Sequence, residues 1–490
     1  MFLMGFGSTR TWSDWEDRNL KGNCEREDLG LRGRWTCIDP FFCAMENKSS
    51  QEEGFSLAKY KLTLRSFYKG FKNREVGALR VHLDSSMVRD INTRKVLSAV
   101  RQKMSTRTEL ARMTNLSYPT VGTIIKALAE DGFVVDHSLG EFSGGRKPML
   151  VKFVPTARYI IGVNLGGAEP QAVLSDLNGE FVSSIVTGYS LDLEEDPVAS
   201  IVQLIEDLRQ SHPFAWERVI GIGISVRGSF DITNGYYYLP GRRAPITLQG
   251  DLEEHFGVPV ILERNASAAA LSEWVQRQDM GIRHILFVNL DKGVSSGLIV
   301  DGQLVRGFLG NAGEFGHVFV DPQGEVCPDC GQRGCLETVV SLGAIVAAAK
   351  RRGLPLQEKA KPLEAYLELI KSVRSGNKIA ASCFEPVIES LGRSLTSFVN
   401  VINPQLVVIG GRVIWHYPEL LAELADCVRS KSWPYSRKGL EFAVATEDKH
   451  NFLHGAITLI LERLFVSMGD QFVGDWNAHK ELMGGRKNAT

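Results

Sequence analysis

The sequence lacks the features of a membrane or secreted protein. No apolar run approaches the roughly 18 residues that a membrane-spanning helix needs. Residues 1–7 are apolar, but no basic segment precedes them as it would in a secretory signal. Cysteine is scarce, at 8 of 490 residues, which argues against a disulfide framework. We therefore expect a cytoplasmic protein with no membrane attachment.

Charge is nearly balanced overall but uneven along the chain. The net charge is −1, and hydrophobic and charged residues make up 44% and 23%, as in ordinary globular proteins. Residues 87–155 hold 11 Lys/Arg against 6 Asp/Glu, whereas residues 156–490 hold 31 against 39. A small basic segment on an acidic body is typical of a DNA-binding module attached to another domain. The length suggests about three domains.

The two ends of the chain carry no pattern of a folded domain. Residues 1–86 show no sustained helical or strand period, and their tryptophans are scattered among charged residues. We interpret residues 1–86 as a poorly ordered extension, or as one foreign to a native protein that begins at Met87. Residues 467–490 are interpreted as a polar tail.

Residues 87–155 carry the pattern of a winged helix-turn-helix. One helix is expected at 91–104 and a second from Ser105-Thr106 onward. After the turn 114–116, Ser117 can cap a third helix that has Pro119 in its first turn and ends at Gly132. Residues 133–135 and 149–154 indicate a two-stranded wing. A generic three-helix bundle is the alternative, but the caps, the turn length and the wing agree on the first interpretation.

The third helix of this motif enters the major groove through its N-terminal residues. We expect this helix to contact base edges or thymine methyl groups and to make one phosphate contact. Two basic residues follow in the wing loop 143–148. The predicted DNA contacts are Ser117, Tyr118, Thr120, Val121, Thr123, Lys126, Arg146 and Lys147. Two glycines and a proline hold the wing loop extended, so that Arg146 can enter a narrow A·T-rich minor groove. The alternative is a plain turn with solvated charges.

Residues 156–466 contain one strand pattern twice. A strand at 159–163 runs into Asn164-Leu165-Gly166-Gly167, and a second strand follows at 171–175. The pattern recurs 125 residues later, where Val288-Asn289-Leu290 precedes a glycine turn and a strand at 298–300. The repeat predicts a duplicated α/β fold with a cleft between two lobes. Glycines after such strands let backbone amides approach a phosphate or nucleoside.

Further motifs make the sequence specific. Gly313-Glu314-Phe315-Gly316-His317 precedes a cysteine-rich stretch at 327–337, and GIGISVRG (221–228), LERNASAAALSEW (262–274) and NVINPQLVVIGG (400–411) fit the same pattern. Residues 87–460 resemble the ROK family of sugar kinases and sugar-responsive repressors, in the branch with a winged helix before the kinase-like domain. The resemblance implies an α/β, duplicated actin-like (ribonuclease H-like) sugar-kinase fold with two lobes and a central cleft over 156–466, including a zinc loop at 313–337.

The cysteine cluster predicts a metal site from its own spacing. His317, Cys327, Cys330 and Cys335 are separated by nine, two and four residues, and three thiolates with one imidazole form a closed Cys₃His zinc site. We expect one structural Zn²⁺ per chain. The family has one residue between its first two cysteines, whereas this chain has two. This difference affects how Cys327 matches the family pattern, and not the metal site as a whole. Redox or structural thiols without a metal are the alternative.

The resemblance also implies a sugar site beside the metal. Glu314 and Glu337 would accept hydrogen bonds from sugar hydroxyls, and His317 would use one ring nitrogen for zinc and the other for the sugar. Gly228 and Ser229 match a loop that closes over the sugar. Asn265 occupies a further sugar-contacting position.

The kinase machinery departs from the family pattern at two places. Asn265 replaces the aspartate that takes the proton from the sugar hydroxyl, and an amide cannot act as that base. Loss of a general base costs about 10²–10⁴ in rate. In the phosphate loop, Ala168 and Glu169 replace the threonine and lysine of the family. Arg264 replaces the usual asparagine next to Asn265, so the chain departs from the family's sugar contacts on that side.

These observations favour a catalytically degenerate, sugar-responsive transcriptional repressor. It would bind a palindromic operator as a homodimer or homotetramer, with a sugar as inducer or co-repressor. An active ATP-dependent sugar kinase with an auxiliary DNA-binding domain is the alternative, and a regulator that responds to a phosphotransferase protein instead of a sugar is a third.

The first prediction concerns the N-terminal extension. A chain that begins at Met87 should keep a cooperative thermal melt, because residues 1–86 carry no capping pattern and no period that would pack against a core. Calorimetry of the full and shortened chains checks this. Loss of the cooperative transition in the shortened chain would show that the extension is part of a folded unit.

Overall fold

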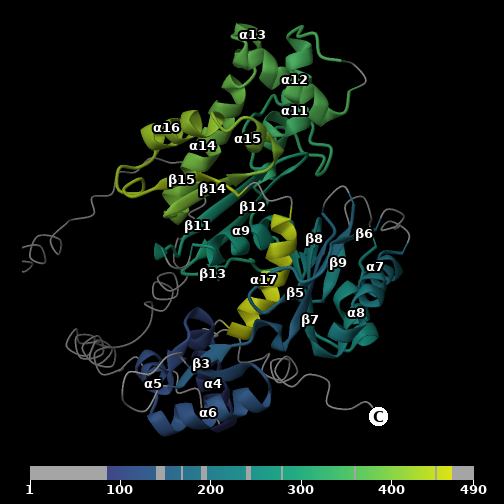
Figure 1. Ribbon diagram of the computed structural model, residues 1–490. Helices are drawn as coiled ribbons and strands as arrows, with labels where there is room; N and C mark the ends of the chain where they lie inside the picture. Colours follow the sequence, from purple (N-terminus) through teal and green to yellow (C-terminus); the bar gives the residue numbers. More distant parts are fainter. Residues whose placement is uncertain are drawn as a thin grey trace, which may run out of the picture. The chain divides into compact units, whose positions relative to one another are not determined.

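The computed structural model describes residues 85–138, 149–166, 169–188, 196–238, 244–277, 280–357, 360–446 and 450–465 (Figure 1). Among these residues, no helix combines the length and the hydrophobicity required to cross a membrane. The described chain begins with a small helical module and continues into two five-stranded sheets with their covering helices.

The winged helix-turn-helix predicted for the first module is confirmed. Its helices are α4 (Ser85–Gln102), α5 (Arg107–Thr114) and α6 (Tyr118–Glu130), and its sheet has the order β1 (Ser105–Thr106), β3 (Met149–Phe153), β2 (Val134–Ser138). All pairings in this sheet are antiparallel. We call this module the head.

Local capping explains where the head helices begin and end. Thr106 and Glu109 form a reciprocal capping box at the start of α5. Asn115 ends α5 in a left-handed conformation, which asparagine tolerates better than most residues. The Ser117 hydroxyl accepts the amide of Thr120 at the start of α6, and the predicted proline lies in the first turn. Three helices and the wing then enclose one apolar core: Val96, Leu97, Val100, Leu110, Val121, Ile124, Ile125, Leu128, Phe133 and Val151.

The first lobe is built on a sheet with the strand order β10-β7-β4-β5-β6. Its strands are β4 (Tyr159–Asn164), β5 (Gln171–Asp176), β6 (Val186–Thr187), β7 (Val219–Val226) and β10 (Val260–Arg264). β4 pairs antiparallel with β5 and parallel with β7, and β7 pairs parallel with β10. Helices α7 (Pro197–Ser211) and α8 (Leu248–Phe256) accompany it, together with the hairpin β8 (Ser229–Asp231) and β9 (Tyr236–Tyr238). Helix α9 (Asn265–Val275) follows β10 in the chain but packs on the sheet of the second lobe.

The second lobe repeats this topology. Its sheet has the order β13-β12-β11-β14-β15, formed by β11 (Ile285–Leu290), β12 (Val294–Val300), β13 (Gln303–Leu304), β14 (Leu406–Gly410) and β15 (Glu441–Val444). β11 pairs antiparallel with β12 and parallel with β14, as β4 does with β5 and β7. The predicted duplication is therefore confirmed by strand order and direction.

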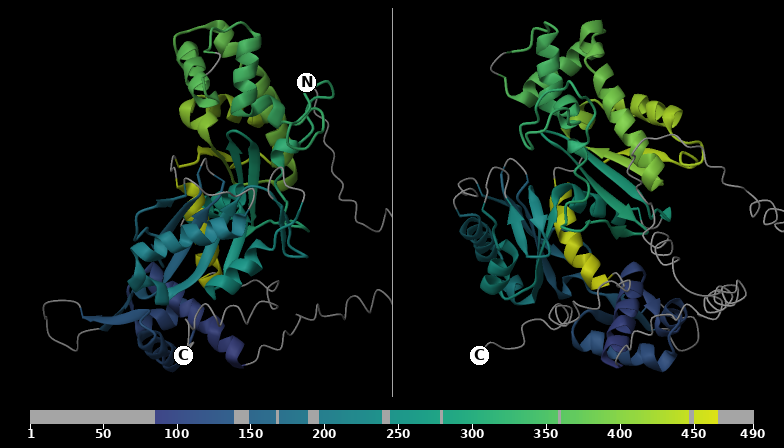
Figure 2. Two further views of the ribbon diagram at one scale, coloured as in Figure 1. Left: turned by 90° about the vertical axis from the view of Figure 1, so that its right-hand side faces the viewer. Right: turned by 180° about the vertical axis from the view of Figure 1, so that it is seen from behind.

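Most helices of the second lobe follow between β13 and β15. They are α10 (Glu337–Val340), α11 (Leu342–Arg351), α12 (Pro362–Arg374), α13 (Lys378–Ser382), α14 (Glu385–Ile402), α15 (Arg412–His416) and α16 (Leu420–Lys431). An apolar stripe lies on α14, where Val387, Leu391, Leu395 and Val399 enter the core of this lobe. Figure 2 shows these helices gathered at the end of the second sheet.

The C-terminal helix α17 (Asn451–Phe465) connects the three parts. It packs against β7 and β4 of the first lobe and along α9 (Figure 1). Its end reaches the head, where the carbonyl of Phe465 accepts the Ser98 hydroxyl at 2.8 Å. The Phe465 ring also packs edge-on against Phe153 and beneath the guanidinium of Arg101. The head and the first lobe therefore share one continuous apolar cluster.

The second prediction tests how α17 is seated. A Cβ at Gly223 on β7 would lie 1.8 Å from the carbonyl oxygen of Ala456 on α17, so only glycine allows this approach. Gly223→Ala should lower the free energy of unfolding by about 1–3 kcal/mol, the usual cost of overpacking. The control is Gly250→Ala in α8, where a Cβ meets no atom within 4 Å and the helix should gain up to about 1 kcal/mol. Equal denaturation midpoints for the two variants would contradict the prediction.

Candidate functional site

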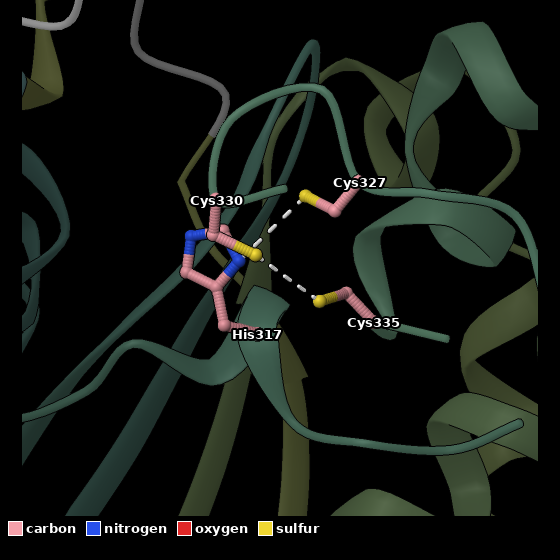
Figure 3. A group of neighbouring side chains, drawn as sticks. All are labelled: His317, Cys327, Cys330 and Cys335. Carbon is pink, nitrogen blue, oxygen red and sulfur yellow. Dashed lines mark hydrogen bonds between the residues drawn. The ribbon is translucent and has the colours of Figure 1, made fainter. Parts of the chain in front are cut away.

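Four predicted metal ligands come together on the loop that follows β13. His317 ends the 3₁₀ turn Phe315–His317, and the three cysteines lie on the hairpin-like loop between it and α10. The ligand atoms of His317, Cys327, Cys330 and Cys335 all lie within 4.8 Å of one another. Figure 3 shows the three sulfur atoms on one side of the imidazole, with the second ring nitrogen pointing away from them.

The distances within this cluster fit one tetrahedral ion. Cys327 Sγ lies 3.8 Å from His317 Nδ1, and Cys330 Sγ lies 3.5 Å from Cys335 Sγ. Metal–ligand bonds of about 2.0–2.3 Å place neighbouring tetrahedral ligands about 3.5–3.8 Å apart, whereas a disulfide bond is about 2.05 Å long. Burial and the neighbouring thiols raise the pKa of the Cys335 thiol to about 12. Three thiolates at these distances would repel one another without a cation, so the donor set suits a metal.

Backbone turns hold the ligands in place. The amide of Cys327 donates to the carbonyl of Gln332, and the amide of Gly331 donates to the carbonyl of Cys327. Gly334 has a φ of 80°, and a Cβ there would lie 1.8 Å from the carbonyl oxygen of Asp321. Glycine at this point is thus required for the close approach of the two sides of the loop.

Glu337 follows the metal loop in the chain and is the first residue of α10. It is buried, and one of its carboxylate oxygens accepts the amide of Val294 at 2.6 Å. Burial raises the pKa of this carboxyl, and the neighbouring Asp329 raises it further, against the opposing effect of the Val294 amide. Arg227 forms an ion pair with Asp329 at 3.9 Å. Glu337 can therefore accept one more hydrogen bond from a ligand through its remaining lone pairs.

Glu314 forms an ion pair that the sequence did not predict. Its Oε1 accepts a hydrogen bond from the guanidinium of Arg264 at 2.5 Å, and Arg264 is 5% exposed. The same guanidinium donates to the carbonyls of Ala312 and Ser296. The sequence marked Arg264 only as a departure from the family pattern. Nothing in the local sequence indicates that its partner would be a residue 50 positions away.

The first lobe contributes Asn265 and the loop after β4 to the same region. A Cβ at Gly166 would overlap the side-chain amide of Asn265, so the two segments are in direct contact. The buried Asn164 shapes the loop by accepting the amide of Gly166 at 3.0 Å. Asn265 Oδ1 and Arg264 Nε are buried atoms with no hydrogen-bond partner among the described residues. Glu169 is exposed, and Ala168 lies outside the described residues.

Gly228 and Ser229 lie at the junction of β7 and β8. Gly228 has a φ of 137°, and a Cβ there would lie 2.3 Å from the carbonyl oxygen of Tyr238 on the neighbouring strand. The hydroxyl of Tyr237 donates to the carbonyl of Arg227 and holds this corner. Ser229 is exposed. The corner is therefore fixed by backbone contacts that only glycine permits, with the Ser229 side chain available to solvent.

The head exposes part of the predicted DNA-contacting set. Tyr118, Thr123 and Lys126 are exposed on α6, and Thr120 is half-buried with its hydroxyl bonded to Ser117. Val121 is wrongly placed in that set, because its side chain is fully buried in the core of the head and has no surface to offer. Arg146 and Lys147 lie outside the described residues.

Comparisons with known proteins agree with this architecture. The chain is 28% identical over 358 residues to the xylose repressor of Bacillus subtilis (strain 168), covering 73% of this chain and 90% of that protein. It is 28% identical over 339 residues to the DNA-binding transcriptional repressor Mlc of Escherichia coli (strain K12), covering 67% and 82%.

Solved structures show the same fold. A ROK family transcriptional regulator described as a homologue of the Escherichia coli Mlc protein aligns with a TM-score of 0.68 at 23% identity, over 81% of this chain and all of that one. A ROK family glucokinase from Streptomyces griseus, solved with glucose and AMPPNP, aligns with a TM-score of 0.51 at 25% identity, over 61% of this chain and 98% of that one. The family model described as "ROK family" matches residues 160–463, well over half of the sequence. The chain belongs to the ROK family.

Proposed function

We propose that this protein is a sugar-responsive transcriptional repressor. The observation that carries the proposal is the attachment of a winged helix-turn-helix to a ROK domain through α17. Two relatives that match 90% and 82% of their own length to this chain are named repressors. The exposed residues of α6 supply the major-groove contacts, and the basic wing loop with Arg146 and Lys147 supplies the second reader. We propose that the protein binds a palindromic operator as a homodimer or homotetramer.

The proposed sugar site comprises groups from both lobes. It consists of Gly228, Ser229, Asn265, Glu314, His317 and Glu337. Its chemistry suits hydroxyl groups, because two carboxylates accept hydrogen bonds while the imidazole and an amide side chain donate them. Support comes from the proximity of Glu337 to the metal loop and from the contact between Asn265 and the loop after β4.

We further propose that the metal is a structural Zn²⁺ held by His317, Cys327, Cys330 and Cys335. All four ligand positions come from protein, so the ion would cross-link the loop and would fix His317 through Nδ1. The other ring nitrogen of His317 then carries the proton and can donate it in a hydrogen bond. Glu337 begins the helix that follows the same loop, and His317 lies close enough to oppose the rise in the pKa of its carboxyl.

The same site is poorly suited to phosphoryl transfer. The side chain at 265 is an amide and cannot accept the proton of a sugar hydroxyl as a base. An acidic, exposed Glu169 in the loop after β4 would repel the phosphates of ATP, and Ala168 offers no hydroxyl. We therefore propose that binding persists in this domain without kinase turnover.

One helix pair offers a physical route from the site to the head. Helix α9 begins at Asn265 and packs along α17, where a Cβ at Gly455 would lie 2.5 Å from the carbonyl oxygen of Ala268. The other end of α17 contacts α4 and β3 through Phe465. A sugar that favours one arrangement of the lobes would shift α9, and the close contact would pass this shift to α17 and the head.

The third prediction concerns the metal. Purified protein should contain one zinc per chain, and Cys330→Ser should lose the zinc and melt at a lower temperature, because metal binding contributes to folding free energy. The matched control is Cys427→Ser, a half-buried free cysteine outside the cluster, which should keep its zinc. Metal analysis together with calorimetry checks this. Active, freshly purified protein without metal would contradict it.

The fourth prediction tests the function. Selection from a random DNA pool should enrich a palindromic site, and at least one neutral monosaccharide among glucose, xylose and N-acetylglucosamine should change the affinity of the full chain for that site. ATP consumption with the same sugars should stay below about 1 per second, the lower end of ordinary enzyme rates. Sugar-dependent turnover above that rate would instead favour a kinase.

A substitution on α6 separates base recognition from general DNA binding. Tyr118→Ala should weaken binding to the selected site by about 1–3 kcal/mol and leave binding to random DNA nearly unchanged, since a base contact carries sequence information. Ile379→Ala, which removes a similarly exposed side chain from α13 in the second lobe, should leave both affinities unchanged. Equal losses of affinity for both DNAs in Tyr118→Ala would show that Tyr118 contacts the phosphate backbone and not a base.

A further inference from the structure

We propose that Arg264 is a specificity-determining residue of the ligand site, because its ion pair with Glu314 forms an inter-lobe clasp that a neutral sugar must displace in order to bind. The proposal rests on the proposed sugar site. It assigns two roles to one side chain: Arg264 would compete with neutral sugars for Glu314, and it would link ligand binding to the arrangement of the lobes.

The clasp spans two different sheets. Arg264 is the last residue of β10 in the first lobe. Glu314 follows β13 in the second lobe, and the adjacent Gly313 is bonded to β12 through the amide and the hydroxyl of Ser296. A hydrogen bond between Arg264 and Glu314 therefore ties the edge of one lobe to the loop that leads into the metal ligands.

A second ion pair of opposite polarity lies beside the first. Glu263, the residue before Arg264 on β10, accepts a hydrogen bond from Arg306 Nε at 2.8 Å. Farther along the same segment, Asn311 exchanges two hydrogen bonds with the backbone of Phe230 on β8. The segment 306–314 is thus fastened to the first lobe along its length. Of its two ion pairs, only the one with Arg264 uses a residue of the proposed sugar site.

The environment of Arg264 makes its pairing with Glu314 strong but exchangeable. The guanidinium is buried, so an unpaired charge would be costly, and Glu314 is its carboxylate partner among the described residues. The Glu314 side chain is 40% exposed, so a ligand can approach it from solvent. A hydroxyl that binds Glu314 must compete with a charge-assisted hydrogen bond, which is about twice as strong as a neutral one.

Unused hydrogen-bonding capacity next to the clasp indicates where a ligand would engage. Arg264 Nε is a buried donor and Asn265 Oδ1 a buried acceptor, and neither has a partner among the described residues. A sugar hydroxyl can donate a hydrogen bond to Asn265 Oδ1, on the residue next to Arg264. A ligand that does so would bind beside the guanidinium and draw it away from Glu314, which would release the inter-lobe contact.

The decisive experiment measures affinity and stability in the same variants. Arg264→Asn should bind glucose, xylose or N-acetylglucosamine about tenfold more tightly than the parent chain, because Glu314 no longer has a charged competitor. The same variant should melt at a lower temperature in the absence of sugar. Arg264→Gln, which keeps more of the side-chain volume, should show both changes and replaces it if Arg264→Asn does not fold.

A matched control separates the clasp from a general weakening of the lobe contact. Arg306→Gln breaks the neighbouring ion pair, which contains no residue of the proposed sugar site, and should lower the melting temperature without changing the dissociation constant for sugar. A double-mutant cycle of Arg264→Asn and Glu314→Gln should in addition show a coupling in unfolding free energy. Absence of coupling would overturn the clasp.

The remaining outcomes distinguish this proposal from the proposed function. If the parent and Arg264→Asn bind the same sugar with equal affinity, sugar sensing stands and the competition between Arg264 and ligand is overturned. Equal gains in affinity for Arg264→Asn and Arg306→Gln would also overturn it, because the effect would then be general loosening. If neither form binds any of the three sugars, the proposed sugar site fails and the clasp proposal fails with it.

Discussion

The close approach of α17 to the backbone of its neighbours is the constraint on which the rest of the structure depends. Glycines remove the Cβ atoms that would keep this helix at a normal distance: Gly223 faces Ala456, Gly162 faces Ile457, and Gly455 of α17 itself faces Ala268 on α9. Interaxial distances fall when side chains at a contact are small, and packing becomes correspondingly intolerant of added volume. A helix held this closely cannot shift without moving α9 and β7 with it.

Buried charge reinforces the same junction. Glu273 on α9 is fully buried, accepts the amide of Thr446 at 3.2 Å, and pairs with Arg277. It also accepts the side-chain amide of Asn451, the first residue of α17. Burial raises the pKa of this carboxyl, against the effect of Arg277. A buried carboxylate with several donors specifies one arrangement of its partners, because losing any donor leaves charge uncompensated.

The sequence predicted those parts of the protein that depend on local patterns. The Ser117 cap with Pro119, the turn at 114–116, the two wing strands and the repeated strand motif led to the head and to the duplicated lobes, because each is set by residues a few positions apart. The spacing of His317 and the three cysteines likewise located the metal cluster. Contacts between distant segments could not be predicted in this way. The Arg264–Glu314 pair joins two lobes, and Val121 seemed available to DNA because helical spacing alone does not reveal which neighbours cover a side chain.

The origin of α17 at the far end of the chain has a consequence for the order of folding. The first lobe takes its strands from residues 159–264, yet the helix that covers β4 and β7 is made of residues 451–465. During synthesis the ribosome would complete the head, the first sheet and the whole second lobe before this covering helix emerged. The apolar face of the first sheet would therefore remain without its cover through most of translation, and that interval is when the nascent chain has the greatest need of protection by chaperones.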